Sequence, residues 1–336
     1  MLRRGALLHC CMLLTLLSGG VQAAELSQRQ ATVEAFWRTA MTTGEIAGAG
    51  GVPLRYLYRK SPAGRGALVI VGGRTEFAEK YAELVYDLKD SGFSLYLYDH
   101  RGQGLSGRML PDRLKGHVGS FSDYVDDLGI FIDKVVGAGA HRQIFLLSHS
   151  MGGAISILYA ARYPQRISGL ILVSPMLAIN TRAIPLWLVR AVSSFAVLVG
   201  RGDAAVIGAG RYHRQLVFEG NDVTGSRTRF EWNRRLIAEN PQMEIGPPTY
   251  RWLGEALAAG RQVMALDTSS LPPALLLQGE RDRMVGKKEQ REFCAGAADC
   301  RFVRLQGARH EVLMEEDEIR GRAVAEILRF LGAKGR

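Results

Sequence analysis

The chain has 336 residues, of which 47% are hydrophobic and 23% are charged, and its formal net charge is +10 at pH 7. These values are those of an ordinary globular protein that is long enough to bury a core, as one large domain or one domain with an insertion. The excess of Lys and Arg favours an anionic partner such as a membrane surface. The basic residues are scattered rather than gathered in a block interleaved with aromatic residues, so we expect no nucleic-acid partner.

The first 23 residues have the plan of a secretory signal peptide. A basic start with Arg3 and Arg4 leads into an apolar run at 5–17, and small residues follow up to Ala23. The run is too short for a membrane span, which needs about 20 residues. We therefore predict that residues 1–23 are removed and that the protein is exported, to the periplasm or to a peripheral site on a bacterial membrane. The alternative is an uncleaved N-terminus that holds the protein at the cytoplasmic face of the inner membrane.

Export would leave two cysteines, Cys294 and Cys300, in the mature chain. In an oxidising compartment they could close a small disulfide loop. The alternative is a pair of unbonded, buried thiols.

Strand-like and helix-like segments alternate after Ala24. The expected strands lie at 52–60, 66–73, 93–100, 144–147, 169–175, 273–282 and 301–310, and helices are expected at 27–41, 79–92, 121–136, 154–164, 287–297 and the C-terminus. This rhythm predicts an α/β fold with a mostly parallel, doubly wound sheet. Residues 176–248 interrupt it, so we predict core segments at 24–175 and 249–336 around an inserted segment of helices and loops.

The stretch "LLSHSMGG" places Ser150 between the strand at 144–147 and a helix. A serine ringed by small residues at a sharp strand-to-helix turn is typical of a nucleophile elbow. Ser148 stands where the first glycine of that pattern usually occurs. We predict that Ser150 is a catalytic nucleophile.

A serine nucleophile needs a base and an acid, each at the end of a later strand. Asp282 follows "ALLLQG" and His310 follows "FVRLQGA", so both stand where this plan requires them. Glu280 is a competitor for the role of the acid. His149 is expected to point away from its neighbour Ser150.

The oxyanion of acyl transfer needs two backbone N–H donors. Met151, directly after the nucleophile, supplies one candidate. The turn after the strand at 66–73 supplies the other, at Arg74, because Gly72 and Gly73 permit close approach of the backbone.

Two other stretches match known motifs only in part. "GQGLSG" at 102–107 matches a dinucleotide fingerprint, but Pro111 prevents the helix that should follow it. His310 and Glu311 begin an H-E-x-x-H zinc motif, yet Met314 takes the place of the second histidine. We expect neither a cofactor nor a catalytic metal.

Four stretches, "DHRGQGLSGR", "GHVGSFSDYVDDL", "HSMGGAIS" and "GPPTYRWLGEAL", resemble the bacterial lysophospholipase family. This family belongs to the monoacylglycerol-lipase-like branch of the α/β-hydrolases, and the resemblance runs from about residue 33 to the C-terminus. It implies an α/β-hydrolase fold, a triad of Ser150, Asp282 and His310, and an oxyanion donor at Arg74. It also implies that residues 176–248 form a lid over an acyl-chain pocket. Gly72 is a departure, because the family often has histidine there.

The sequence thus predicts a serine esterase that cleaves an acyl ester of a lysophospholipid or monoacylglycerol. One alternative is an aminopeptidase on the same fold, which would aim carboxylates such as Glu219 or Glu231 at a substrate amine. Another is a non-catalytic binding protein, but no member of the triad is missing.

Within the predicted lid, the run at 184–200 is apolar but too short and too polar to span a bilayer. We predict that its apolar face, with Trp187, contacts lipid, and that nearby arginines hold it to anionic head groups. These arginines are Arg182, Arg190, Arg201 and Arg211. The alternative is a helix packed on the domain as ordinary core.

Overall fold

A computed structural model describes residues 28–182, 184–208 and 217–335. The predicted signal peptide at 1–23 lies outside these residues. The chain divides into two compact units, Met1–Met41 and Thr42–Arg336. The described part of the first unit is a helix at 28–40, as the sequence predicts.

The second unit is built on an eight-stranded sheet with the order β1-β2-β4-β3-β5-β6-β7-β8. Strand β2 pairs antiparallel with both β1 and β4, whereas all other neighbours in the sheet pair in parallel. The strands are β1 (Thr42–Ala47), β2 (Pro53–Arg59), β3 (Ala67–Val71), β4 (Ser94–Tyr98), β5 (Ile144–His149), β6 (Gly169–Val173), β7 (Ala274–Gly279) and β8 (Cys300–Leu305). The predicted α/β-hydrolase fold with a mostly parallel sheet is confirmed.

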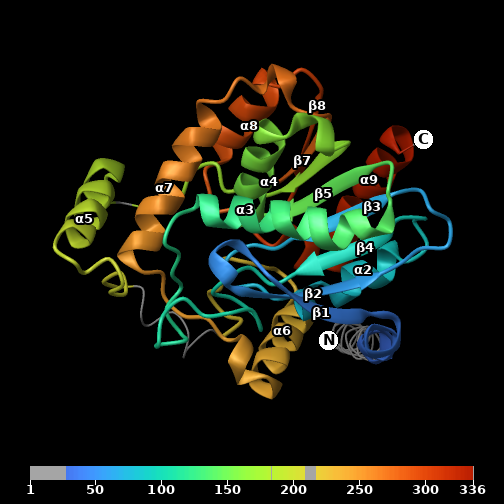
Figure 1. Ribbon diagram of the computed structural model, residues 1–336, viewed down its shortest axis with the longest axis horizontal. Helices are drawn as coiled ribbons and strands as arrows, with labels where there is room; N and C mark the ends of the chain where they lie inside the picture. Colours follow the sequence, from blue (N-terminus) through green and yellow to red (C-terminus); the bar gives the residue numbers. More distant parts are fainter. Residues whose placement is uncertain (1–27, 183, 209–216, 336) are drawn as a thin grey trace, which may run out of the picture. The chain divides into compact units, whose positions relative to one another are not determined.

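The central strands are apolar because helices cover both faces of the sheet. Every residue of β3, β4, β6 and β7 is buried, as is usual for parallel strands between two helical layers. On β5, Leu146 belongs to the core that also contains residues of α3 and α4. Its neighbour Phe145 points the other way and packs edge-on against Phe330 of α9. Figure 1 shows α3 and α4 lying across one face of this sheet.

The helices follow the strands in the expected alternation. They are α2 (Ala82–Leu88), α3 (Ser122–Phe131), α4 (Met151–Arg162), α5 (Leu186–Leu198), α6 (Arg227–Glu239), α7 (Tyr250–Met264), α8 (Lys287–Gly296) and α9 (Asp317–Lys334). A 3₁₀ turn at Ala78–Tyr81 leads into α2, and a π-helical turn at Ile132–Val136 extends α3. No helix within 28–182, 184–208 or 217–335 is long and apolar enough to cross a membrane.

Strand β1 was not predicted from the sequence. Its sequence, "TTGEIA", is mostly polar, and its residues are exposed or half-buried. It lies at the edge of the sheet and pairs only with β2. The hydrophobic pattern that identifies buried strands is therefore absent from it.

The segment between β6 and β7 contains α5, α6 and α7. Helices α5 and α6 fall within residues 176–248, and α7 follows that range and contacts both α4 and α5. At the other end of the sheet, Cys294 of α8 and Cys300 of β8 form a disulfide bond, with their Cα atoms 5.3 Å apart.

Candidate active site

The backbone at Ser150 has the strained conformation of a sharp turn. Its φ is 50° and its ψ is −115°, which few residues other than glycine adopt. Two hydrogen bonds hold it: its N–H donates to the carbonyl of Val173 (3.0 Å), and its carbonyl accepts from the N–H of Met176 (2.8 Å). Strand β6 and the chain that follows it therefore fix the turn between β5 and α4.

The small residues around Ser150 each have a packing reason. A Cβ on Gly152 would overlap the carbonyl oxygens of Val71 and Gly72, at the end of β3. Ser148, in place of the usual glycine, is fully buried, and its hydroxyl lies 2.6 Å from that of Ser156 in α4. The departure from the elbow pattern is thus accommodated by a hydrogen bond.

The structure brings Ser150, His310 and Asp282 together in a hydrogen-bonded row. The Oγ of Ser150 lies 2.9 Å from Nε2 of His310, and Nδ1 of His310 lies 2.8 Å from Oδ2 of Asp282. All three residues are buried, at 8%, 7% and 2% exposure. This is the geometry that a serine nucleophile, its base and an orienting acid require.

Asp282 is held as a carboxylate by its neighbours. Burial opposes its ionisation, but the hydrogen bond and charge of His310 lower the pKa of Asp282 below its ordinary value. The backbone N–H groups of Met284 and Val285 also donate to its Oδ1, at 2.8 and 3.3 Å. Asp282 can therefore orient His310 and balance a positive charge on it.

The competing acid, Glu280, faces elsewhere. Its carboxylate pairs with Arg304 at 2.5 Å and accepts from the N–H of Gly307 at 2.9 Å. It therefore makes no contact with His310 in this arrangement.

The two predicted oxyanion donors lie at the ends of neighbouring strands. Met151 is the first residue of α4, where an N–H has no acceptor within the helix. Arg74 lies in the turn after β3, where Thr75 has a positive φ of 64°. Gln103 clamps that turn: its Oε1 accepts from the N–H of Thr75 (2.8 Å), and its Nε2 donates to the carbonyl of Gly73 (3.0 Å).

This clamp gives "GQGLSG" a structural role that sequence reasoning missed. The helix that a dinucleotide fingerprint requires does not follow this stretch. Instead, the stretch forms a tight loop in which Gly102 and Gly104 have positive φ angles of 77° and 51°. At Gly104 a Cβ would overlap the carboxylate of Asp99. The loop thereby presents Gln103 to the turn that carries Arg74.

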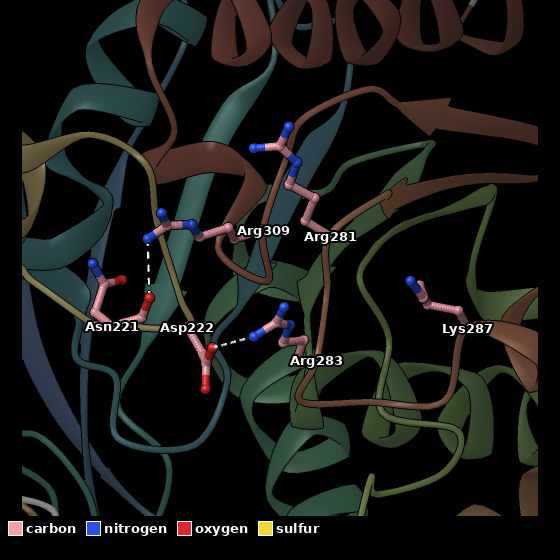
Figure 2. A pocket seen from close by; sticks show the side chains of 7 residues that line it. Asn221, Asp222, Arg281, Arg283, Lys287 and Arg309 are labelled. Atoms are coloured by element: carbon pink, nitrogen blue, oxygen red, sulfur yellow. Dashed lines mark hydrogen bonds and ion pairs between the residues drawn. The ribbon is translucent and has the colours of Figure 1, made fainter. Parts of the chain in front are cut away.

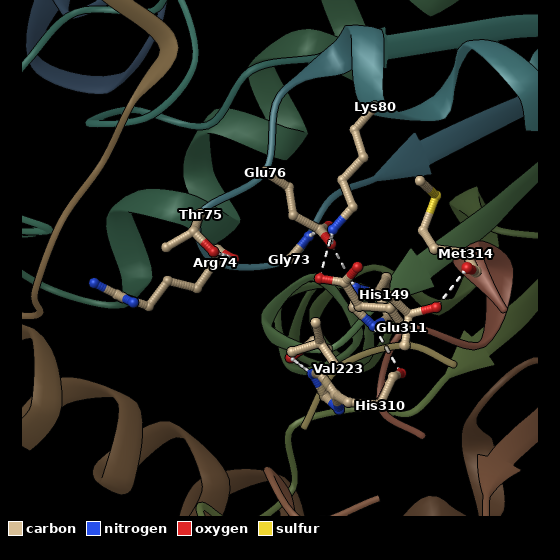
Figure 3. Close-up of polar contacts among 12 residues, drawn as sticks. Gly73, Arg74, Thr75, Glu76, Lys80, His149, Val223, His310, Glu311 and Met314 are labelled. Carbon is tan, nitrogen blue, oxygen red and sulfur yellow. Dashed lines mark hydrogen bonds and ion pairs between the residues drawn. The ribbon is translucent and has the colours of Figure 1, made fainter. Parts of the chain in front are cut away.

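A buried cluster of charged side chains, Glu76, Lys80, His149 and Glu311, lies beside the triad (Figure 3). Oε1 of Glu76 lies 2.9 Å from Nδ1 of His149 and 2.8 Å from Nζ of Lys80. Lys80 also pairs with Glu311 at 2.7 Å. Two carboxylates and two basic groups thus satisfy one another, with Glu76, Lys80 and His149 buried and the side chain of Glu311 17% exposed.

His149 belongs to the site in a role that the sequence did not indicate. It lines the same cavity as Ser150, and its ring centre is 4.9 Å from that of His310. Its Nδ1 faces the carboxylate of Glu76, and its Nε2 faces the carbonyl of His310 at 3.2 Å. Because both partners can only accept, His149 has to be protonated at both nitrogens to satisfy them. Burial opposes this charge, but Glu76 raises the pKa of His149 above its ordinary value.

Ser150 and His310 open into a cavity of about 530 Å³. Its other lining is largely apolar and comes from the segment after β6, from α7 and the residues just before it, and from the loop after β7: Met176, Ile179, Pro247, Pro248, Trp252, Leu253, Met284 and Val285. Such a lining suits an apolar ligand next to a few polar groups. Within the described residues, no three His, Cys, Asp or Glu side chains gather as metal ligands would.

Comparison with known proteins finds similar sequences that cover most of the chain. The family model described as serine aminopeptidase, S33, matches residues 62–317. Lysophospholipase L2 of Escherichia coli (strain K12) is 40% identical over 303 residues, which cover 88% of each chain. The probable lysophospholipase L2 of Haemophilus influenzae is 34% identical over 280 residues, 83% of this chain and 88% of the relative.

Among solved structures, a soluble variant of monoglyceride lipase from Saccharomyces cerevisiae superimposes with a TM-score of 0.71 at 18% identity. The match covers 88% of this chain and 96% of that one. At this identity the likeness establishes the fold that the two proteins share.

From the charges of the buried cluster we predict that Glu76→Gln lowers the free energy of unfolding by an amount that depends on pH. Burial opposes the ionisation of Glu76, but His149 and Lys80 hold its pKa well below the ordinary value of 4.5. Its contribution is therefore complete above pH 4.5 and is lost as pH falls through the lower folded pKa. The pKa of His149 is raised from 6.5, so the contribution of His149 to stability is complete below pH 6.5. This contribution is lost as pH rises through the higher folded pKa.

Urea unfolding should therefore show the largest destabilisation by Glu76→Gln, about 3 kcal/mol, between pH 4.5 and 6.5. The exposed Glu316→Gln serves as the control and should leave the free energy of unfolding nearly unchanged. A loss in Glu76→Gln that is the same from pH 4 to pH 9 would contradict the charge assignment.

Proposed function

The chain belongs to the serine aminopeptidase S33 family, within its bacterial lysophospholipase group of carboxylic ester hydrolases, and from this premise we propose that it hydrolyses the acyl ester of a lysophospholipid or monoacylglycerol through Ser150, His310 and Asp282. The observation that carries the proposal is the hydrogen-bonded row from Ser150 to Asp282 at the wall of an apolar cavity of about 530 Å³. The cavity would take the acyl chain, and the row would supply the nucleophile.

In the proposed reaction, Oγ of Ser150 attacks the ester carbonyl while Nε2 of His310 takes its proton. The N–H groups of Met151 and Arg74 bind the oxyanion that forms. His310 then gives its proton to the leaving glycerol oxygen, and an acyl-enzyme remains on Ser150. Water, deprotonated by His310, attacks the acyl-enzyme and releases the fatty acid. Asp282 keeps His310 oriented and balances its charge in both halves of the reaction.

The arrangement favours an ester substrate over a peptide with a free N-terminus. Glu219 and Glu231, the carboxylates suggested for binding an amine, are exposed and both pair with Arg227. Neither lines the cavity of Ser150. The carboxylates that do line it, Glu76 and Glu311, are already bonded to Lys80.

Substitutions in the row test this proposal. Ser150→Ala should lower kcat on monopalmitoylglycerol by about 10⁶-fold and abolish labelling by a fluorophosphonate probe, because no other group there can form the acyl-enzyme. Asp282→Asn should lower kcat by about 10⁴-fold, since the amide stabilises the wrong tautomer of His310. Glu280→Gln is the matched control and should retain activity. Labelling that persists in Ser150→Ala would end the assignment, and a larger loss in Glu280→Gln than in Asp282→Asn would move the acid role to Glu280.

We also propose that the protein is exported after removal of residues 1–23. The sequence pattern of those residues and the bond between Cys294 and Cys300 both support this location. Structural disulfides persist in oxidising compartments and are rare in the cytosol.

The number of free cysteines among the four in the sequence tests this proposal. Cys10 and Cys11 lie in the segment proposed to be removed. Alkylation of the denatured protein without reductant, followed by intact mass measurement, should therefore find no modified cysteine in protein from its native cells. A chain that begins at Met1 with four modified cysteines would show a reduced, unprocessed protein and would contradict export.

For residues 176–248 we propose the role of a lid that touches lipid. Helix α5 exposes an unusual number of large apolar side chains: Trp187 is 70%, Phe195 64% and Leu198 82% exposed. Arg182, with its side chain 74% exposed, lies just before this helix, and Arg201 lies just after it. Arg211 lies outside the described residues. An apolar face flanked by cations suits the surface of an anionic membrane.

Trp187→Ala should weaken binding to vesicles that contain anionic lipid by about tenfold or more, because burying a large apolar side chain contributes roughly 1.5–3 kcal/mol. Turnover of vesicle-bound substrate should fall with it, and turnover of a soluble short-chain ester should not. The control is Leu328→Ala, which removes an exposed apolar side chain from a different helix, α9. Binding that is indifferent to lipid charge and to salt would leave α5 without a membrane role.

A further inference from the structure

A second hollow, of about 580 Å³, carries positive charge that the proposed chemistry does not use. Figure 2 shows Arg283 and Arg309 beside Asp222 and Asn221, with Arg281 and Lys287 farther from them in the same lining. We call the hollow that these residues line the basic pocket.

The cations of the basic pocket outnumber the acids that could neutralise them. Asp222, the one carboxylate among the described residues of its lining, already pairs with Arg182 at 3.0 Å and lies 3.8 Å from Arg283. Across the described parts of the chain, Arg281, Lys287 and Arg309 form no ion pair with a carboxylate. The pocket therefore has the electrostatic character of an anion site.

Two of its cations are held by backbone oxygens. Nη1 of Arg309 donates to the carbonyls of Asn221 (3.0 Å) and Thr224 (2.7 Å). Nζ of Lys287 donates to the carbonyl of Glu280 at 2.7 Å. These bonds orient the side chains without neutralising them, so an anion would meet donors that are already in place.

The basic pocket lies on the loops that carry the base and the acid of the triad. Arg281 and Arg283 flank Asp282, and Arg309 precedes His310. The two loops are bonded to each other, since the N–H of Arg281 donates to the carbonyl of Ala308 at 2.7 Å.

A third hollow, of about 400 Å³, has lining residues in common with both the basic pocket and the cavity of Ser150. It shares Asn221 and Asp222 with the basic pocket. It shares Val223 and Met284 with the cavity of Ser150. The basic pocket and the cavity of Ser150 are also adjacent along the chain, because Asp222, Arg283 and Arg309 line the pocket and the residue after each lines the cavity. The two hollows are therefore close enough for one ligand to reach both.

We propose that the basic pocket binds the phosphate of the substrate's own head group. Guanidinium groups match phosphate oxygens in planar, paired hydrogen bonds. A lysophospholipid has the required layout, because its phosphate is joined to the acyl ester through the glycerol backbone. The inference rests on the proposed esterase function and narrows it: the substrate carries a phosphate, and a neutral monoacylglycerol is the poorer substrate.

The test compares two esters with the same acyl chain, palmitoyl lysophosphatidylglycerol and monopalmitoylglycerol, both below their micelle concentrations. The variant is Arg281→Gln with Arg283→Gln, two exposed side chains at the pocket. The matched control is Lys288→Gln with Arg291→Gln, which removes the same charge from exposed positions of α8 outside the pocket. Urea unfolding checks that both variants remain folded.

In the pocket variant, kcat/KM for the lysophospholipid should fall about tenfold or more, since a hydrogen bond to a charged group is worth at least that factor. Its kcat/KM for monopalmitoylglycerol should stay within twofold of wild type, and the control should resemble wild type on both esters. Equal losses on the two esters, a loss shared by the control, or no loss would each overturn the proposal.

Two further outcomes separate the possible sources of phosphate and of failure. If inorganic phosphate inhibits monopalmitoylglycerol hydrolysis in wild type but not in the pocket variant, and lysophospholipid turnover is unchanged in that variant, the pocket binds a free anion and the inference is wrong. Wild-type protein that cleaves the monoacylglycerol but not the lysophospholipid would overturn the inference and leave the esterase function standing. Wild-type protein that cleaves neither ester would overturn the proposed function itself.

Discussion

The carboxylate of Glu76 is buried at 4% exposure, and groups from separate parts of the chain donate to it: the N–H of Gly73, the ammonium of Lys80, the hydroxyl of Tyr81 and the ring of His149. A carboxylate removed from water is costly unless such partners surround it. Each partner therefore has to stay in place for the others to be tolerated. The turn after β3, the 3₁₀ turn before α2 and the end of β5 are tied together at this one group. The turn after β3 carries Arg74, and the end of β5 leads into Ser150.

The site combines this polar centre with an apolar cavity on one side and a basic hollow on another. In the proposed binding mode an amphiphile lies across all three, with its chain among residues such as Met176 and Trp252, its ester at Ser150 and its charged end near Arg309. The loops after β7 and β8 make this possible because each contributes to both functions. Asp282 and His310 face inward along the row, whereas the arginines next to them in the sequence face the basic pocket. Neighbouring positions on a loop thus serve chemistry and recognition at once.

The sequence predicted the features that depend on local pattern. Apolar strands, the elbow around Ser150 and the order of serine, acid and histidine at successive strand ends could all be read from it, whereas the polar edge strand β1 could not. The roles of Gln103 and His149 were missed, because each depends on a contact with a distant part of the chain: Gln103 with the turn at Gly73, and His149 with Glu76. The basic pocket was missed for the same reason, since its cations come from separate loops.

The charges around His310 explain why a cluster as polar as this one can lie beside a catalytic base. A lone protonated His149, with its ring centre 4.9 Å from that of His310, would oppose the positive charge that His310 carries during acyl transfer. Glu76 balances His149, and Glu311 balances Lys80, so the cluster is neutral as a whole. The charged group that is hydrogen-bonded to the imidazole of His310 is then Asp282. Neutrality of the cluster leaves Asp282 as the group that stabilises the imidazolium, which is the division of roles that the proposed reaction requires.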